Sequence, residues 1–162
     1  EIGAGVILGA IVAVNAFGDV VDPTTNQIIA GARSTTIGPL RVGSPGYFAD
    51  TLEVMKTMIG RTILGLASRG NTVIGVVATN ARLNKEQANK IAQMAHNGLA
   101  RCIRPAHTMH DGDIIFAIAT GKHKADVNIV GAFAAEVVAL AILRAVRCAQ
   151  AVAGLPAIKD AP

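Results

Sequence analysis

Two long apolar runs constrain the fold of this chain most strongly. One extends from Val6 to Val14 and the other from Thr72 to Thr79, and both are rich in β-branched residues with few polar side chains. A strand with one face in water alternates apolar and polar residues, so an unbroken apolar run predicts a strand covered on both faces. Helical patterns occur in the same chain, and the sequence therefore predicts an α/β protein built in layers.

A capping box predicts where one helix begins. Asn84 has the side chain of an N-cap, and Gln87 stands at the reciprocal position three residues later. We expect this helix to end near Cys102, ahead of Pro105. Its apolar stripe consists of Ala88, Ile91, Ala92, Ala95 and Leu99.

The longest apolar stretch, Val127 to Leu143, allows two interpretations. Its length is close to the lower limit for a bilayer-spanning helix, but Glu136 in its middle would be costly in lipid. We therefore expect a buried core helix and no membrane contact. This helix should begin at Asp126 or Asn128 and end near Gly154.

The remaining segments predict shorter elements and connections. The turn chemistry and composition favour a short strand over Gln27 to Ala32, an exposed loop over Ser34 to Gly46 and a short helix over Ala49 to Ile59. Farther along, we expect a strand from Asp113 to Ala119 and a turn from Thr120 to Lys124.

Composition and charge exclude several classes of protein. Of 162 residues, 51% are hydrophobic and 16% are charged, which excludes intrinsic disorder. The net charge of +4 comes from scattered basic residues and the aromatic share is 3%, so we expect no nucleic acid partner. Cys102 and Cys148 lack the spacing of metal ligands, which favours two free thiols in a cytoplasmic protein.

A metal ion and a nucleotide cofactor are both disfavoured. His107, His110, Asp111 and Asp113 lie within seven residues, but zinc sites usually draw on helical histidine pairs or cysteine-rich knuckles. The glycines at the start of the chain lead into strand-like residues, whereas a dinucleotide fingerprint follows a strand and opens a helix. We expect no cofactor.

Two groups of residues are candidates for chemistry. Asp111 and Asp113 stand at the mouth of a strand, where they can face one pocket, although an Asx turn is the commoner reason for this pattern. Thr72 begins an apolar strand after Gly70 and Asn71. Cleavage before Thr72 would give one residue both a hydroxyl nucleophile and an α-amino base with a pKa of about 7.7 to 8.0. A threonine here is also commonly structural.

Several co-ordered blocks closely resemble the DmpA-like hydrolases over nearly the whole chain. This family includes an L-aminopeptidase/D-esterase, β-peptidyl aminopeptidases, an endo-type nylon-oligomer hydrolase and a pantetheine hydrolase. The matching blocks are Val12 to Val20, Gly70 to Ala81, Ala92 to Arg101, Ile103 to Thr108 and Asp111 to Gly121.

The resemblance implies a fold and a domain organisation. Family members form a four-layer αββα sandwich resembling N-terminal-nucleophile hydrolases, of which this chain would be only part. Their precursors cleave themselves into an α and a β chain that stay together. Residues 1–71 would then be the end of the α chain and residues 72–162 the β chain. Together these residues form part of one domain, which an upstream α-chain segment completes, and the αβ units assemble as a homo-oligomer.

The resemblance also implies roles for individual residues. Autocleavage would fall between Asn71 and Thr72, with Thr72 as nucleophile and its α-amino group as general base. Asn15 would stand in the oxyanion hole, and Asp111 and Asp113 would position the nucleophile. The aminopeptidase branch has serine after glycine at the cleavage point, so the Asn-Thr pair here resembles the nylon-oligomer branch more closely. A further family residue, a lysine or tyrosine, lies upstream of this sequence.

The function predicted in this way is hydrolysis of a small peptide or other linear amide by a self-processing enzyme. Two alternatives stay open. One is a non-catalytic oligomeric scaffold or binding relative, and the other is an acyltransferase of the ornithine acetyltransferase type.

Overall fold

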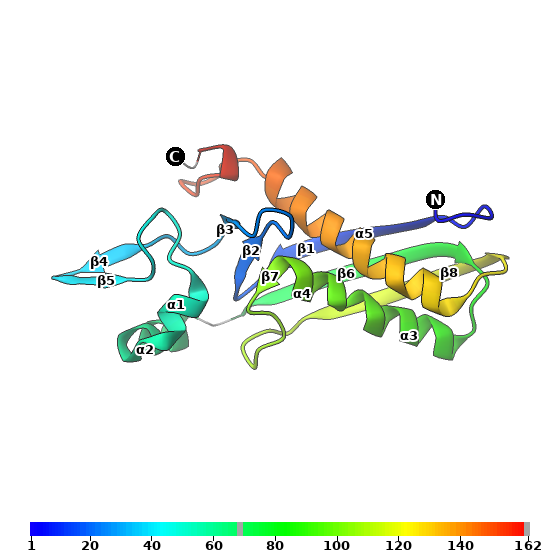
Figure 1. Cartoon of the computed structure of the whole chain (residues 1–162), viewed down its shortest axis with the longest axis horizontal. Coiled ribbons are helices and arrows are strands. Elements are labelled where there is room, and N and C mark those ends of the chain that lie inside the picture. Colours follow the sequence, from blue (N-terminus) through cyan, green and yellow to red (C-terminus); the bar gives the residue numbers. More distant parts are fainter. Residues whose placement is uncertain (68–69, 161–162) are drawn as a thin grey trace.

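The computed structural model describes residues 1–67 and 70–160, and its centre is a three-stranded sheet (Figure 1). The sheet consists of β1 (Leu8–Asn15), β6 (Thr72–Ala81) and β8 (Ile114–His123), with β6 in the middle. β1 runs antiparallel to β6, and β8 runs parallel to it. The parallel pair needs a long crossover, which the helices after β6 provide. The expected mixed α/β architecture is confirmed.

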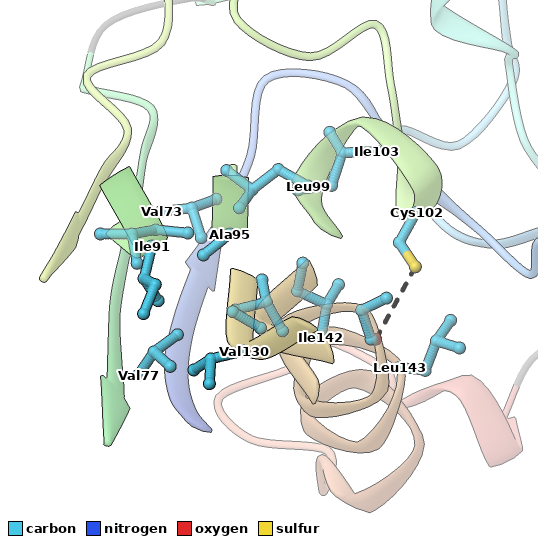
Figure 2. Packing of buried hydrophobic residues seen from close by; sticks show 14 of the residues in the cluster. Val73, Val77, Ile91, Ala95, Leu99, Cys102, Ile103, Val130, Ile142 and Leu143 are labelled. Carbon is cyan, nitrogen blue, oxygen red and sulfur yellow. Dashed lines mark hydrogen bonds between the residues drawn. The ribbon is translucent and has the colours of Figure 1, made fainter. Parts of the chain in front are cut away.

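Three helices cover one face of this sheet. They are α3 (Lys85–Ala95), α4 (Asn97–Cys102) and α5 (Val127–Cys148). α3 begins with the predicted capping box, and α5 is capped by the side chain of Asp126. Figure 2 shows the core where these helices meet β6, and several of its large side chains are fully buried. They include Val73, Val77, Ile91, Leu99, Val130 and Ile142.

The other elements lie toward one end of the central sheet (Figure 1). Two short strands precede the first helices and pair with a third from the crossover, in the order β3-β2-β7. A separate hairpin and two helices follow them in the chain. These elements are β2 (Asp19–Val21), β3 (Ile28–Ala30), β7 (Ile103–Arg104), β4 (Thr35–Ile37), β5 (Leu40–Val42), α1 (Thr51–Lys56) and α2 (Met58–Ala67), and a 3₁₀ turn, η1 (Ile158–Asp160), follows α5.

The prediction that the long strands are covered on both faces is wrong within this chain. Every second residue of β1, β6 and β8 points away from the helices. Ile11 is 74% exposed, Phe116 is 52% exposed and Ile74 is 49% exposed. Among residues 1–67 and 70–160, helices pack on one face only, and the other face is an open apolar surface. We call this surface the open sheet face; its large side chains are Ile11, Ile74, Ile114, Phe116 and Ile118.

Three local predictions need correction. The segment Ser34 to Gly46 is a hairpin rather than a loop: Ile37 pairs with Leu40 across a turn in which Gly38 has φ +59°. This positive φ suits the first position of a tight hairpin turn. The helix expected over Ala49 to Ile59 is divided between α1 and α2, because Thr57 is in the extended region. The expected turn over Thr120 to Lys124 lies mostly within β8, which continues to His123.

The long helix α5 is a core helix, as predicted, but it ends earlier than expected. Its length and hydropathy would also suit a membrane span, and it packs against β1, α3 and α4. It ends at Cys148 rather than near Gly154. The residues that follow Cys148 are exposed as far as Pro156, so no core surface supports further helix there. Cys102 and Cys148 are free, as expected.

The close contact between α4 and α5 predicts that Gly98→Ala destabilises the protein. A Cβ at Gly98 would lie 2.5 Å from the Ala135 carbonyl oxygen and 2.8 Å from Val138 Cβ. We expect a loss of about 1–3 kcal/mol in the free energy of unfolding, measured by chemical denaturation. Gly65→Ala in α2 is the control, since no described atom beyond its own helix lies within 4 Å of its added Cβ. Equal stability of the two variants would contradict this packing.

Candidate active site

The candidate residues meet at one end of the central sheet. Asn15, the last residue of β1, pairs with Thr72, the first residue of β6. Paired residues of an antiparallel ladder project to the same side, so both side chains lie on the open sheet face. Just before β6 and β8, Asn71 forms a parallel bridge with Asp111. Strand pairing thus brings together residues from three separate parts of the sequence.

The carbonyl group between Asn71 and Thr72 accepts two hydrogen bonds. The Thr72 hydroxyl donates to the Asn71 carbonyl oxygen at 2.6 Å. The main-chain N–H of Gly112 donates to the same oxygen at 3.0 Å. A hydroxyl therefore lies against the peptide group that self-processing would cut, and a second donor, from the loop before β8, polarises the same carbonyl group.

Asp111 braces the loop that carries Gly112. One carboxylate oxygen accepts from the Phe17 main-chain N–H at 3.2 Å. The other accepts from the main-chain N–H and the hydroxyl of Thr108, at 3.0 and 2.8 Å. These contacts join the segment after β1 to the loop before β8. None of the described hydrogen bonds of Asp111 is to Thr72.

Asp113 is bonded to the residue that follows Thr72. Its Oδ1 accepts from the Val73 main-chain N–H at 2.8 Å, and its side chain is only 5% exposed. Its Oδ2 lies 3.8 Å from His107 Nδ1. The His107 backbone has φ +58°, an uncommon conformation for a residue other than glycine. The carboxylate thus links the loop before β8 to the first peptide of β6.

Asn15 is close to the predicted cleavage point but bonds to a different carbonyl. Its side-chain Nδ2 donates to the Gly70 carbonyl oxygen at 2.9 Å, one residue before the carbonyl of Asn71. A hollow of about 310 Å³ also opens beside Asn15. Its lining is mostly small and apolar and includes Val14, Ala16, Gly18, Ala30 and Ala145.

Two contributors were not identified from the sequence. The Gly112 N–H belongs to the main chain and has no side-chain signature. His107 was considered only as a metal ligand, whereas it lies against Asp113 and its ring centre is 5.5 Å from that of His96. Within residues 1–67 and 70–160, no three or more His, Cys, Asp or Glu side chains converge in a way that could hold a metal ion.

Comparisons with known proteins identify the family of this chain. The sequence model of peptidase family S58 matches residues 2–158, and the chain belongs to that family. The resemblance to the DmpA-like hydrolases is thereby confirmed.

The individual relatives are similar at moderate identity. An uncharacterized aminopeptidase of Mycobacterium tuberculosis is 36% identical over 172 residues, covering 97% of this chain and 48% of the relative. An uncharacterized aminopeptidase of Mycobacterium leprae is 39% identical over 168 residues, covering 94% of this chain and 44% of the relative. A 6-aminohexanoate-oligomer endohydrolase of Kocuria is 33% identical over 91 residues, covering 48% of this chain and 26% of the relative. The chain spans about half the length of the mycobacterial relatives.

The histidine pair predicts a pH-dependent stability. Burial lowers the pKa of His96, the neighbouring His107 lowers it further, and Asp113 opposes the shift. Because the folded-state pKa lies below the unfolded value of about 6.5, the unfolded chain takes up the proton more readily. The folded state keeps its full stability above about pH 6.5, and it loses stability as the pH falls from this value toward the lower folded-state pKa of His96.

We therefore expect His96→Gln to lose less unfolding free energy than the wild type between about pH 7.5 and pH 5.5. Chemical denaturation at the two pH values measures the difference. His123→Gln is the matched control, because its ring packs against Gly5, away from His96. If all three proteins lose the same free energy, His96 does not carry this dependence.

Proposed function

We propose that the full-length protein is a self-processing amide hydrolase that cuts itself between Asn71 and Thr72. The observation that carries this proposal is the 2.6 Å contact between the Thr72 hydroxyl and the carbonyl oxygen of the peptide to be cut. Membership of peptidase family S58 supports it. The position of Thr72 at the start of the central strand supports it as well, because that strand would hold the new terminus after cleavage.

The cleavage proceeds in two balanced steps. In the first, Thr72 Oγ attacks the Asn71 carbonyl carbon, the C–N bond breaks, and the hydroxyl proton passes to the departing Thr72 nitrogen. The product is an ester between the Asn71 acyl group and Thr72 Oγ. In the second, water hydrolyses this ester and leaves an Asn71 carboxylate, a free hydroxyl and a free α-amino group on Thr72.

The freed terminus then acts on an external substrate. The α-amino group takes the proton from Thr72 Oγ as the oxygen attacks an amide carbonyl, and it returns that proton to the leaving amine. Water releases the acyl group from Thr72. Asn15 contributes to the oxyanion hole in this reaction, while Asp111 and Asp113 position the nucleophile.

The substrate class is a peptide or another linear amide. The relatives named aminopeptidase and 6-aminohexanoate-oligomer endohydrolase both support this class.

We also propose that an upstream segment completes a four-layer αββα sandwich. The open sheet face supports this, because monomers rarely expose so contiguous an apolar surface without a partner. The length of the mycobacterial relatives, about twice that of this chain, allows room for such a segment. A second sheet laid on the open face would also enclose Asn15 and Thr72.

Self-processing is tested by the intact masses of the full-length protein and its Thr72 variants. We expect the wild type to yield two chains, the second beginning at Thr72. Thr72→Ala should stay a single chain because it lacks the attacking hydroxyl. Thr72→Ser is the matched control, since it retains the hydroxyl and should cleave. An uncut wild type, or a Thr72→Ala protein that splits after Asn71, contradicts the proposal.

Hydrolysis is tested separately on the cleaved protein. An acylating ester reagent should label Thr72, and a linear amide should give free acid as the main product. Failure to label Thr72 would favour a binding relative. Dominant transfer of the acyl group to an added amine would favour an acyltransferase.

The sandwich is tested by placing a charge on the open sheet face of the full-length protein. If a second sheet covers this face, Phe116→Asp should cost at least about 3 kcal/mol of unfolding free energy, because it buries an unpaired carboxylate. Lys122→Glu, nearer the end of the same strand, is the control and should change stability by less than about 0.5 kcal/mol. Equally small effects in denaturation experiments would contradict coverage of Phe116.

A further inference from the structure

Two amide donors near the cleavage point bond to different carbonyl oxygens. The Gly112 main-chain N–H is bonded to the Asn71 carbonyl oxygen. The Asn15 side-chain amide is bonded to the Gly70 carbonyl oxygen instead. In the uncut chain, the residue that would serve the oxyanion hole is therefore engaged by the neighbouring peptide.

We propose that the Gly112 N–H is the oxyanion donor of the self-cleavage step and that Asn15 takes up its oxyanion role only afterwards. This inference rests on the proposed self-processing. During self-cleavage Asn15 is a positioning residue, which holds the Gly70 carbonyl. When the segment ending at Asn71 leaves, the Asn15 amide becomes free to bind the carbonyl oxygen of an external substrate.

The geometry suits Gly112 for this step. As the bond between Thr72 Oγ and the Asn71 carbon forms, negative charge develops on the Asn71 oxygen. A donor 3.0 Å from that oxygen is already within the range of oxyanion-hole contacts, so little reorganisation is needed. Gly112 transfers no proton; the hydroxyl proton still passes to the Thr72 nitrogen as the C–N bond breaks.

The absence of a side chain at this position also has a consequence. A Cβ on Gly112 would lie 3.0 Å from Thr72 Oγ, closer than most real Cβ contacts. Glycine therefore lets the N–H reach the carbonyl while leaving room for the attacking hydroxyl.

The aspartates on either side of Gly112 in the sequence hold its main-chain N–H in place. Asp111 is held by Thr108 and Phe17, and Asp113 is held by the Val73 N–H. Because residues 111 and 113 are each bonded to neighbouring segments, the peptide plane between Asp111 and Gly112, which carries the N–H, has little freedom to rotate. The Asp-Gly-Asp sequence thus combines two anchors with one main-chain donor.

The donor is tested by a matched pair of full-length proteins made by in vitro translation. One is the wild type, in which Gly112 keeps the N–H. The other carries glycolic acid at position 112, which also lacks a side chain but has an ester oxygen in place of the N–H. We expect the ester protein to cleave itself about 10²- to 10³-fold more slowly than the wild type. Thermal melts of both proteins establish that each is folded.

Asn15→Ala tests the second half of the proposal. We expect it to slow turnover of an external ester by the cleaved protein about 10²-fold or more, and to slow self-cleavage far less. A general structural defect would slow the two rates together, so their ratio distinguishes the two explanations.

Three outcomes have distinct meanings. A wild type that never cleaves overturns the proposed function, and this inference with it. A wild type that cleaves, with an ester protein that cleaves at the same rate, overturns only the role of Gly112. Equal losses of self-cleavage and turnover in Asn15→Ala overturn the proposed change in the role of Asn15.

Discussion

The antiparallel pairing of β1 with β6 is the constraint on which the rest of the structure depends. It sets Asn15 opposite Thr72, and β1 also provides surface on which α5 packs. The proposed cut lies between these two strands in the sequence. After cleavage, main-chain hydrogen bonds along the whole ladder would still join the two chains. An α/β protein can therefore lose a peptide bond at its candidate site without losing its core.

The parts of the fold set by local chemistry could be predicted from the sequence. Asn84 with Gln87 marked the start of α3, and Asp126 was one of two predicted starts for α5. The apolar runs marked β1 and β6. The end of α5 could not be predicted, because it depends on where the surface under the helix stops. The open sheet face was missed for a similar reason. An apolar run indicates that both faces of a strand are buried in the complete protein, but it does not indicate which segment buries them.

The candidate site was predictable as a set of residues but not as a set of contacts. Resemblance to the family singled out Thr72 and the aspartate pair, and the structure brings them to one end of the sheet. Which carbonyl each donor reaches depends on strand register, which the sequence does not display. The engagement of Gly112 with Asn71 follows from the bridge between Asn71 and Asp111. The engagement of Asn15 with Gly70 follows from the pairing of Asn15 with Thr72.

The proposed cleavage point lies at the end of the ladder between β1 and β6, and this position has a mechanistic consequence. Thr72 is the first residue of β6, and the Val73 N–H is bonded to Asp113. Breaking the peptide before Thr72 removes the bridge at Asn71, but it leaves the Val73 contact and the pairing beyond it in place. The hydroxyl would thus keep its position while the adjacent nitrogen becomes a free amine. Catalytic groups held by rigid strands lose little rate to reorganisation, so a terminus formed within a sheet would be ready for substrate as soon as Asn71 departs.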